Sequence, residues 1–125
     1  MQIELYTKQF YEDHKEEEKT IYKGQLKTAL KGSILEFWNV ETKYQMTILE
    51  NKILLKKPNQ TMTFEKGKKT RTELQTPYGN VCMNLTTTHM EIIGQNEQIQ
   101  KIILHYEIEL DGTKPYQNQI EINIG

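Results

Sequence analysis

The side chains best suited to acid–base or metal chemistry lie in one short stretch, residues 102–112, which reads IILHYEIELDG. His105, Glu107 and Glu109 alternate there with apolar residues. In a strand they would share one face, spaced about 6–7 Å per step of two residues. Two of them could ligate a metal ion, but further ligands would have to come from neighbouring strands. Because the opposite face is entirely apolar and belongs in a core, we interpret the trio as part of a solvent-facing strand surface.

Nucleophilic catalysis has little support in this sequence. Ser33 is the single serine, and no G-x-S-x-G motif surrounds it. Cys82 is the single cysteine; its polar neighbours in register predict partial exposure, and nothing in the sequence places His89 or His105 beside it. Metal-spaced Cys/His sets, P-loops and G-x-G-x-x-G motifs are also lacking. We therefore predict a protein that is not an enzyme and that has no cofactor or metal.

The bulk properties describe one small domain, residues 1–125, with a formal net charge of −1. This charge gives no global field that would attract nucleic acid or an anionic membrane. The N-terminus has no apolar run long enough for a signal peptide or a membrane span. With one cysteine no internal disulfide can form, which favours a reducing, cytoplasmic location.

Hydrophobic residues recur with a period of two along most of the chain, which is typical of half-buried antiparallel strands. The even-numbered residues from 102 to 110 are apolar or aromatic. The odd-numbered residues from 103 to 109 include the His/Glu trio. Even-numbered residues of 102–110 are therefore expected to face the interior. Residues 44–49, 81–86 and 120–124 alternate in the same way.

Turn motifs separate these segments at regular intervals. Asp111-Gly112 predicts a tight turn between the last two strands, and Glu50-Asn51 closes a short hairpin between MTIL and KILL. Asp13-His14-Lys15 is expected at the tip of the first hairpin. Eight to ten short strands result, and no segment keeps a helical stripe for three turns. The sequence predicts an all-β fold, a single antiparallel up-and-down barrel, because closure removes exposed edges.

Two segments support this prediction by resemblance. TELQTPYGNVCMNLTT (72–87) and ILHYEIELDGTKPYQNQIEINI (103–124), with a glycine-marked hairpin near Gly24, resemble the YwiB-like family of small bacterial proteins. That family is a domain of unknown function with a calycin-like barrel, related in architecture to lipocalins. The resemblance implies the fold and no catalytic residues. It is weakest over LEFWNVE (35–41), where either Phe37 or Trp38 could point inward.

The leading functional hypothesis is a barrel that binds a small apolar or amphipathic molecule in its interior. An eight-stranded barrel either fills with side chains or holds one small ligand. A lumen smaller than about 300 Å³ and filled by side chains would argue against this hypothesis. The residues expected to line the lumen are Tyr44, Met46, Ile48, Met83, Leu85, Leu104, Tyr106 and Ile108.

The alternative is a surface interaction module. Residues 52–71 are rich in lysine and could meet an acidic partner or RNA. Phe64 is the one aromatic residue there that could stack on a base, so nucleic acid is the less favoured partner. The patch would consist of Lys56, Lys57, Lys66, Lys68, Lys69 and Arg71. No oligomeric state follows from the sequence.

Overall fold

The structure is a computed structural model that describes residues 1–111 and 113–125. These residues form ten strands and one turn of 3₁₀ helix. The strands are β1 (Gln2–Phe10), β2 (Lys15–Ala29), β3 (Gly32–Trp38), β4 (Lys43–Ile48), β5 (Lys52–Lys57), β6 (Gln60–Glu65), β7 (Lys69–Thr76), β8 (Gly79–Ile93), β9 (Lys101–Leu110) and β10 (Tyr116–Ile124), and the helical turn η1 (Asn96–Gln98) lies between β8 and β9.

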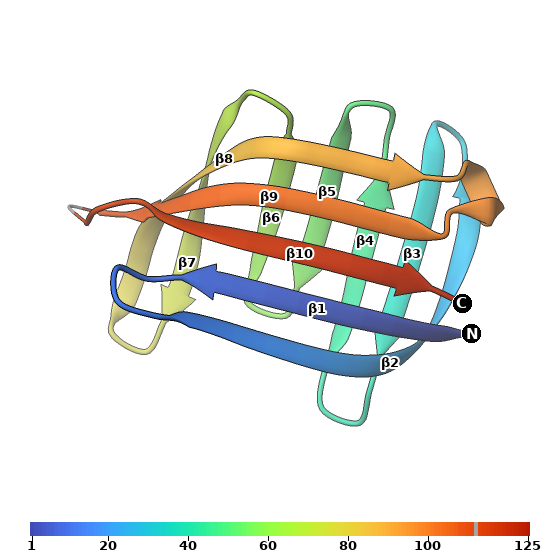
Figure 1. Ribbon diagram of the computed structural model, residues 1–125, viewed down its shortest axis with the longest axis horizontal. Helices are drawn as coiled ribbons and strands as arrows, with labels where there is room; N and C mark the ends of the chain where they lie inside the picture. The colour runs from blue at the N-terminus through green and yellow to red at the C-terminus, as the bar shows by residue number, and fades with distance from the viewer. Residues whose placement is uncertain (112) are drawn as a thin grey trace.

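All ten strands belong to one antiparallel sheet in the order β6-β5-β4-β3-β2-β1-β10-β9-β8-β7. Most sequence neighbours are paired, and the two terminal strands β1 and β10 also pair with each other. Figure 1 shows that β8, β9, β10, β1 and β2 cross the front of the molecule, while β3 to β7 run behind them at a steep angle. The chain is an all-β, nearly closed barrel of the calycin type, as predicted.

The two fifteen-residue strands, β2 and β8, connect the front and back of the barrel. The first half of β2 pairs with β1, and residues 23–29 pair with β3. Gly24 lies inside β2, where a Cβ atom would come within 2.6 Å of Ile3 Cγ1 and 2.7 Å of the Glu36 carbonyl oxygen. The hairpin expected near Gly24 is formed by β2 and β3, and Gly24 lies within its first strand, paired with Phe37. Glycine permits the close approach of the neighbouring backbone and side chain at this position.

A bulge in β8 changes which residues face the core. The register with β9 shifts between Thr87 and His89. Before the shift the odd-numbered residues Met83, Leu85 and Thr87 are buried, and after it Met90 packs against the core. One extra residue in a strand accounts for this change of parity.

The barrel closes without a backbone ladder between its edge strands. In the described chain, β6 and β7 lie at opposite ends of the strand order yet contact each other. Thr70 Oγ1 donates to the carbonyl of Thr63 at 2.9 Å, and Thr72 Oγ1 donates to that of Thr61 at 3.1 Å. We call this contact the β6–β7 seam.

The predicted inside and outside of β9 are confirmed. Ile102 and Leu104 are fully buried, and Tyr106 and Ile108 are each 7 % exposed. His105 and the other odd-numbered residues from 103 to 109 are only partly buried. Hydrophobic burial therefore fixes the face of this strand, because a slip of one residue would turn every side chain over.

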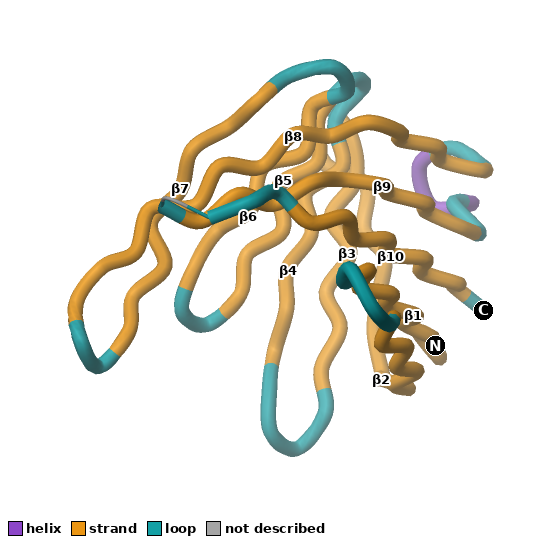
Figure 2. The backbone as a smooth tube through the Cα atoms, turned by 60° about the vertical axis from the view of Figure 1, so that its left-hand side comes forward, coloured by secondary structure: helices purple, strands orange, loops and turns teal. Residues whose placement is uncertain are grey.

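The predicted turns near Asp13–Lys15 and Glu50-Asn51 connect β1 to β2 and β4 to β5. The Asp111-Gly112 turn includes residue 112, which lies outside the described residues. η1 is the purple segment of Figure 2, on the side of the molecule where both termini lie. No helix in the described ranges has the length and apolar character needed to cross a membrane.

Phe37 points inward and Trp38 outward. Phe37 is 1 % exposed and belongs to the core, whereas Trp38 lines a shallow surface groove with Ile21 and Val40. Both faces of residues 35–41 are apolar because one face packs into the core and the other lines this groove.

Candidate functional site

The interior contains a partly enclosed cavity of about 230 Å³ near the β1–β2 hairpin. Strands from both sides of the barrel form its walls. Its lining combines apolar side chains with polar ones: Leu5, Thr7, Lys8, Gln9, Glu18, Thr20, Tyr22, Phe37, Tyr44, Leu55, Lys57, Tyr106, Asn118, Gln119, Ile120 and Ile122. We call it the Lys57 cavity.

Lys57 is the last residue of β5 and lies on the inward face of this strand. It follows the buried residues Ile53 and Leu55 at intervals of two. Burial lowers the pKa of its ammonium group from the ordinary value of 10.5, and no neighbouring charge contributes. Its Nζ forms no ion pair with the described residues. Lys57 is partly buried, and a cation that is partly withdrawn from water without a counter-ion is an uncommon feature inside a barrel.

Three aromatic rings form one wall of the cavity. The Tyr22 ring contacts Phe37 and Tyr44 edge-on, with centroid distances of 5.2 and 5.7 Å, and Phe37 stacks on Tyr44 at 5.1 Å. Burial, with a smaller contribution from Tyr44, raises the pKa of Tyr22 to about 12. The Tyr22 hydroxyl therefore remains protonated at neutral pH and is able to donate a hydrogen bond.

Asn118 and Tyr106 occupy another wall. They face each other across β10 and β9, and Asn118 is 2 % exposed. Asn118 Nδ2 donates to the Tyr116 carbonyl at 3.4 Å, while Oδ1 has no hydrogen-bond partner. Among the described residues, two other buried side-chain oxygens also lack a hydrogen-bond partner: those of Gln60 and Thr87. Neither residue lines the cavity. Burial raises the pKa of the Tyr106 hydroxyl.

Two of the eight predicted lumen residues, Tyr44 and Tyr106, line the Lys57 cavity. The structure places the other six in the packed core, where each is nearly or fully buried: Met46, Ile48, Met83, Leu85, Leu104 and Ile108. Most of the barrel interior is thus filled by side chains. The cavity is smaller than the limit of about 300 Å³ given in the sequence analysis, and side chains fill the rest of the lumen, so the predicted pocket lined by these eight residues is not present in the described part of the chain. Among the described residues, only the small Lys57 cavity at one end of the barrel remains as a ligand site inside the lumen.

The outer face of β9 carries the trio that opened the sequence analysis. The rings of His105 and His89 are tilted neighbours with a centroid distance of 5.1 Å. Burial and the second imidazole lower the pKa of His105. Across the described part of the chain, no three His, Cys, Asp or Glu side chains come close enough together to hold a metal ion.

Neither candidate nucleophile is exposed. Cys82 is 8 % exposed and Ser33 is 2 % exposed. The prediction that Cys82 is partly exposed is therefore wrong. Its register partner on β7 is Glu73, and neither histidine is opposite it.

Five of the six basic residues predicted to form a patch are exposed, and the sixth, Lys57, is not. Lys56, Lys66, Lys69 and Arg71 are exposed, and Lys68 pairs with Glu65 at 3.1 Å. Lys57 turns inward. Its assignment to the surface was wrong because strand alternation puts it on the same face as Ile53 and Leu55.

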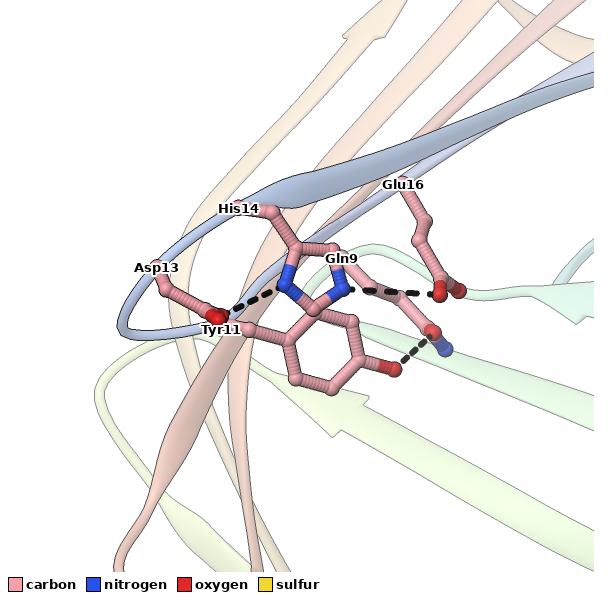
Figure 3. Close-up of polar contacts among 5 residues, drawn as sticks. All are labelled: Gln9, Tyr11, Asp13, His14 and Glu16. Carbon is pink, nitrogen blue, oxygen red and sulfur yellow. Dashed lines mark hydrogen bonds and ion pairs between the residues drawn. The ribbon is translucent and has the colours of Figure 1, made fainter.

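A second polar cluster lies at the tip of the β1–β2 hairpin (Figure 3). His14 Nδ1 is 2.6 Å from Asp13 Oδ1, and its Nε2 is 3.6 Å from Glu16 Oε1. The Tyr11 ring stacks on His14 at 4.7 Å, and its hydroxyl donates to Gln9 Oε1 at 2.8 Å. These groups are mostly exposed, so their ion pairs contribute little to stability. Only Gln9 reaches the cavity lining.

The fold and the site define a class of protein: a nearly closed antiparallel barrel of the calycin type with a small polar cavity at one end. The chain belongs to the family described as a domain of unknown function, DUF1934, whose sequence model matches residues 3–122. Among solved structures, the chain is similar to the ywiB protein from Bacillus subtilis, with a TM-score of 0.75 and 11 % sequence identity. The match covers 99 % of this chain and 90 % of that one. A comparison with curated proteins gives no match.

Lys57, Tyr22 and Asn118 were absent from the predicted lumen residues. Strand alternation could have identified Lys57 and Asn118, because Asn118 also precedes Ile120 and Ile122 on one face. Tyr22 gives no comparable signal, since its strand is polar on both faces from Lys15 to Lys19.

Proposed function

We propose that this protein is a non-catalytic barrel that binds a small, partly apolar molecule in the Lys57 cavity. The observation that carries the proposal is the composition of the cavity wall. Lys57 and Asn118 bring unpaired polar atoms to a space that Leu55, Phe37 and Ile120 make partly apolar. Binding sites for small molecules commonly combine an apolar lining with a few polar groups that orient the ligand.

The volume limits the size of the ligand. A cavity of about 230 Å³ corresponds to about eight water molecules at ~30 Å³ each. A metabolite of this size fits, whereas a long-chain lipid does not.

Native mass spectrometry of the protein purified from its own host tests the proposal, with the denatured sample as control. We expect a retained mass that disappears on denaturation. The variant Thr20→Phe, which fills the cavity, should lose this mass, whereas Thr61→Phe on the exposed face of β6 should keep it. A mass retained equally by both variants, or no retained mass in the unmodified protein, would count against the proposal.

A further inference from the structure

The charge of the Lys57 cavity is the feature that best restricts its ligand. Two lysines line it, but Lys8 pairs with Glu17 at 3.5 Å and is exposed to solvent. Glu18 is the one carboxylate of the lining, and it is exposed to solvent. Lys57, which is partly buried and forms no ion pair with the described residues, is therefore the lysine of the lining whose charge has no counter-ion.

Asn118 supplies a second and independent restriction. Its Oδ1 is a buried acceptor without a donor, and such an atom costs about 1–3 kcal/mol if it stays unpaired. The opposite assignment of the amide nitrogen and oxygen would place an oxygen against the Tyr116 carbonyl oxygen, so the hydrogen bond to that carbonyl identifies Oδ1 as the unpaired atom. A ligand that donates a hydrogen bond at this point would satisfy it.

We propose that the ligand is a small monocarboxylate that carries a hydrogen-bond donor, such as a short hydroxy acid. This inference rests on the proposed function. The carboxylate lies beside Lys57, the donor is directed at Asn118 Oδ1, and the short apolar part contacts Leu55 and Phe37. The Tyr22 and Tyr44 hydroxyls, which also line the cavity, provide further donors to the carboxylate.

Charge matching favours a carboxylate over a phosphate. A phosphate monoester carries about 1.5–2 negative charges at pH 7, and one buried ammonium group compensates only one of them. A carboxylate matches Lys57 one to one and forms a charge-assisted hydrogen bond with it. An uncharged ligand would leave the ammonium group unpaired.

The experiment is a titration of the ¹⁵N-labelled full-length protein followed by NMR, with four probes. They are 2-hydroxyvalerate, valerate, 2-hydroxyvaleramide and inorganic phosphate. We expect 2-hydroxyvalerate to shift the resonances of Leu55 and Asn118 and to bind most tightly. Valerate should bind more weakly, and the neutral amide and phosphate weakest of all.

Two variants assign the recognition to particular side chains. Lys57→Met should weaken 2-hydroxyvalerate binding by about tenfold or more, since the bond involves a charged group. Lys56→Met, which removes the neighbouring exposed lysine, is the matched control and should change little. Asn118→Leu should abolish the preference for 2-hydroxyvalerate over valerate.

The two proposals can fail separately. If the neutral amide binds as tightly as the acid and Lys57→Met has no effect, the carboxylate inference is overturned while the binding function stands. Tighter binding of phosphate would also overturn it. If none of the probes shifts resonances of the cavity residues, the carboxylate inference fails. The proposed binding function is then judged by the mass-spectrometric experiment alone. The comparison of probes on the unmodified protein requires no variant to fold.

Discussion

At the scale of single residues, side-chain parity determines the chemistry of this protein. His105 and Glu107, which resemble a reactive pair in the sequence, lie on the outer face of β9, while Lys57 lies inside. Strand alternation places the His105, Glu107 and Glu109 side chains on the outer face, and it places Lys57 on the inner face. A charged residue is informative here because of the face it occupies rather than because of its neighbours in sequence.

Replacing Leu104 with Ala should lower the free energy of unfolding by about 2–5 kcal/mol, because the side chain is fully buried and leaves a cavity. Denaturant unfolding measures the change. The control is Glu107→Ala on the outer face, with an expected effect of roughly 0.5 kcal/mol or less. A larger effect at Glu107 than at Leu104 would contradict the assignment of the two faces.

Replacing Lys57 with Met should raise the free energy of unfolding by about 0.5–2 kcal/mol near neutral pH, because it removes a partly buried charge that has no counter-ion. Burial lowers the pKa of Lys57, so the folded state holds the proton more weakly than the unfolded chain. The cost is complete below the folded-state pKa and is relieved as pH rises toward 10.5.

The stability difference between Lys57→Met and the unmodified protein should therefore narrow at alkaline pH. Denaturant unfolding at several pH values measures it, with Lys56→Met as control for general effects of charge. The other groups that titrate around the cavity are Lys8, Glu18, Tyr22, Tyr44 and Tyr106, and both proteins retain them. A stability difference between the two proteins that widens as pH rises would contradict the interpretation that the charge of Lys57 destabilises the fold.

At the scale of elements, the irregular positions connect the two sides of the barrel. The bulge between Thr87 and His89 changes the parity of β8, and Gly24 permits close contact with Ile3 in β2. At the β6–β7 seam, threonine hydroxyls take the place of a ladder. These features bend and close a sheet that would otherwise have two open edges.

Replacing Thr70 with Val should destabilise the seam, because valine keeps the shape of the side chain and removes the hydroxyl that bonds the Thr63 carbonyl. We expect a loss of about 0.5–1.5 kcal/mol, and a similar loss for Thr72→Val. Thermal or denaturant unfolding checks this, with the exposed Thr61→Val as control. Equal effects at Thr61 and Thr70 would show that the hydroxyl bonds do not hold the seam.

At the scale of the whole molecule, stability should be greatest where the two terminal strands meet. β1, β10 and β9 each lie between two paired strands and carry the fully buried residues Ile3, Ile122 and Leu104. β6 and β7 each have a ladder on one side only. A few side-chain hydrogen bonds hold two strands together less strongly than a ladder of backbone hydrogen bonds. We therefore expect local opening to occur first at the β6–β7 seam.

Amide hydrogen exchange should therefore be slowest at the centres of β1, β9 and β10 and fastest, among strand residues, at the free edges of β6 and β7. Exchange followed by NMR or mass spectrometry gives the order of protection. The Thr70→Val variant should speed exchange at the seam without changing the order elsewhere. Protection of the β6 and β7 edges that equals that of β9 would contradict this picture.

The sequence by itself determined the fold class, the strand faces of 102–110 and most turns, because these depend on local alternation and on turn residues that act over a few positions. The inward position of Lys57 and the burial of Cys82 were missed because both were assigned from the polarity of their neighbours, although strand alternation with Ile53 and Leu55 does indicate the face of Lys57. Tertiary structure alone brought Lys57, Tyr22 and Asn118 to one cavity. These residues lie on strands that pack across the barrel, and no local pattern specifies which strands face each other or how much space their side chains leave.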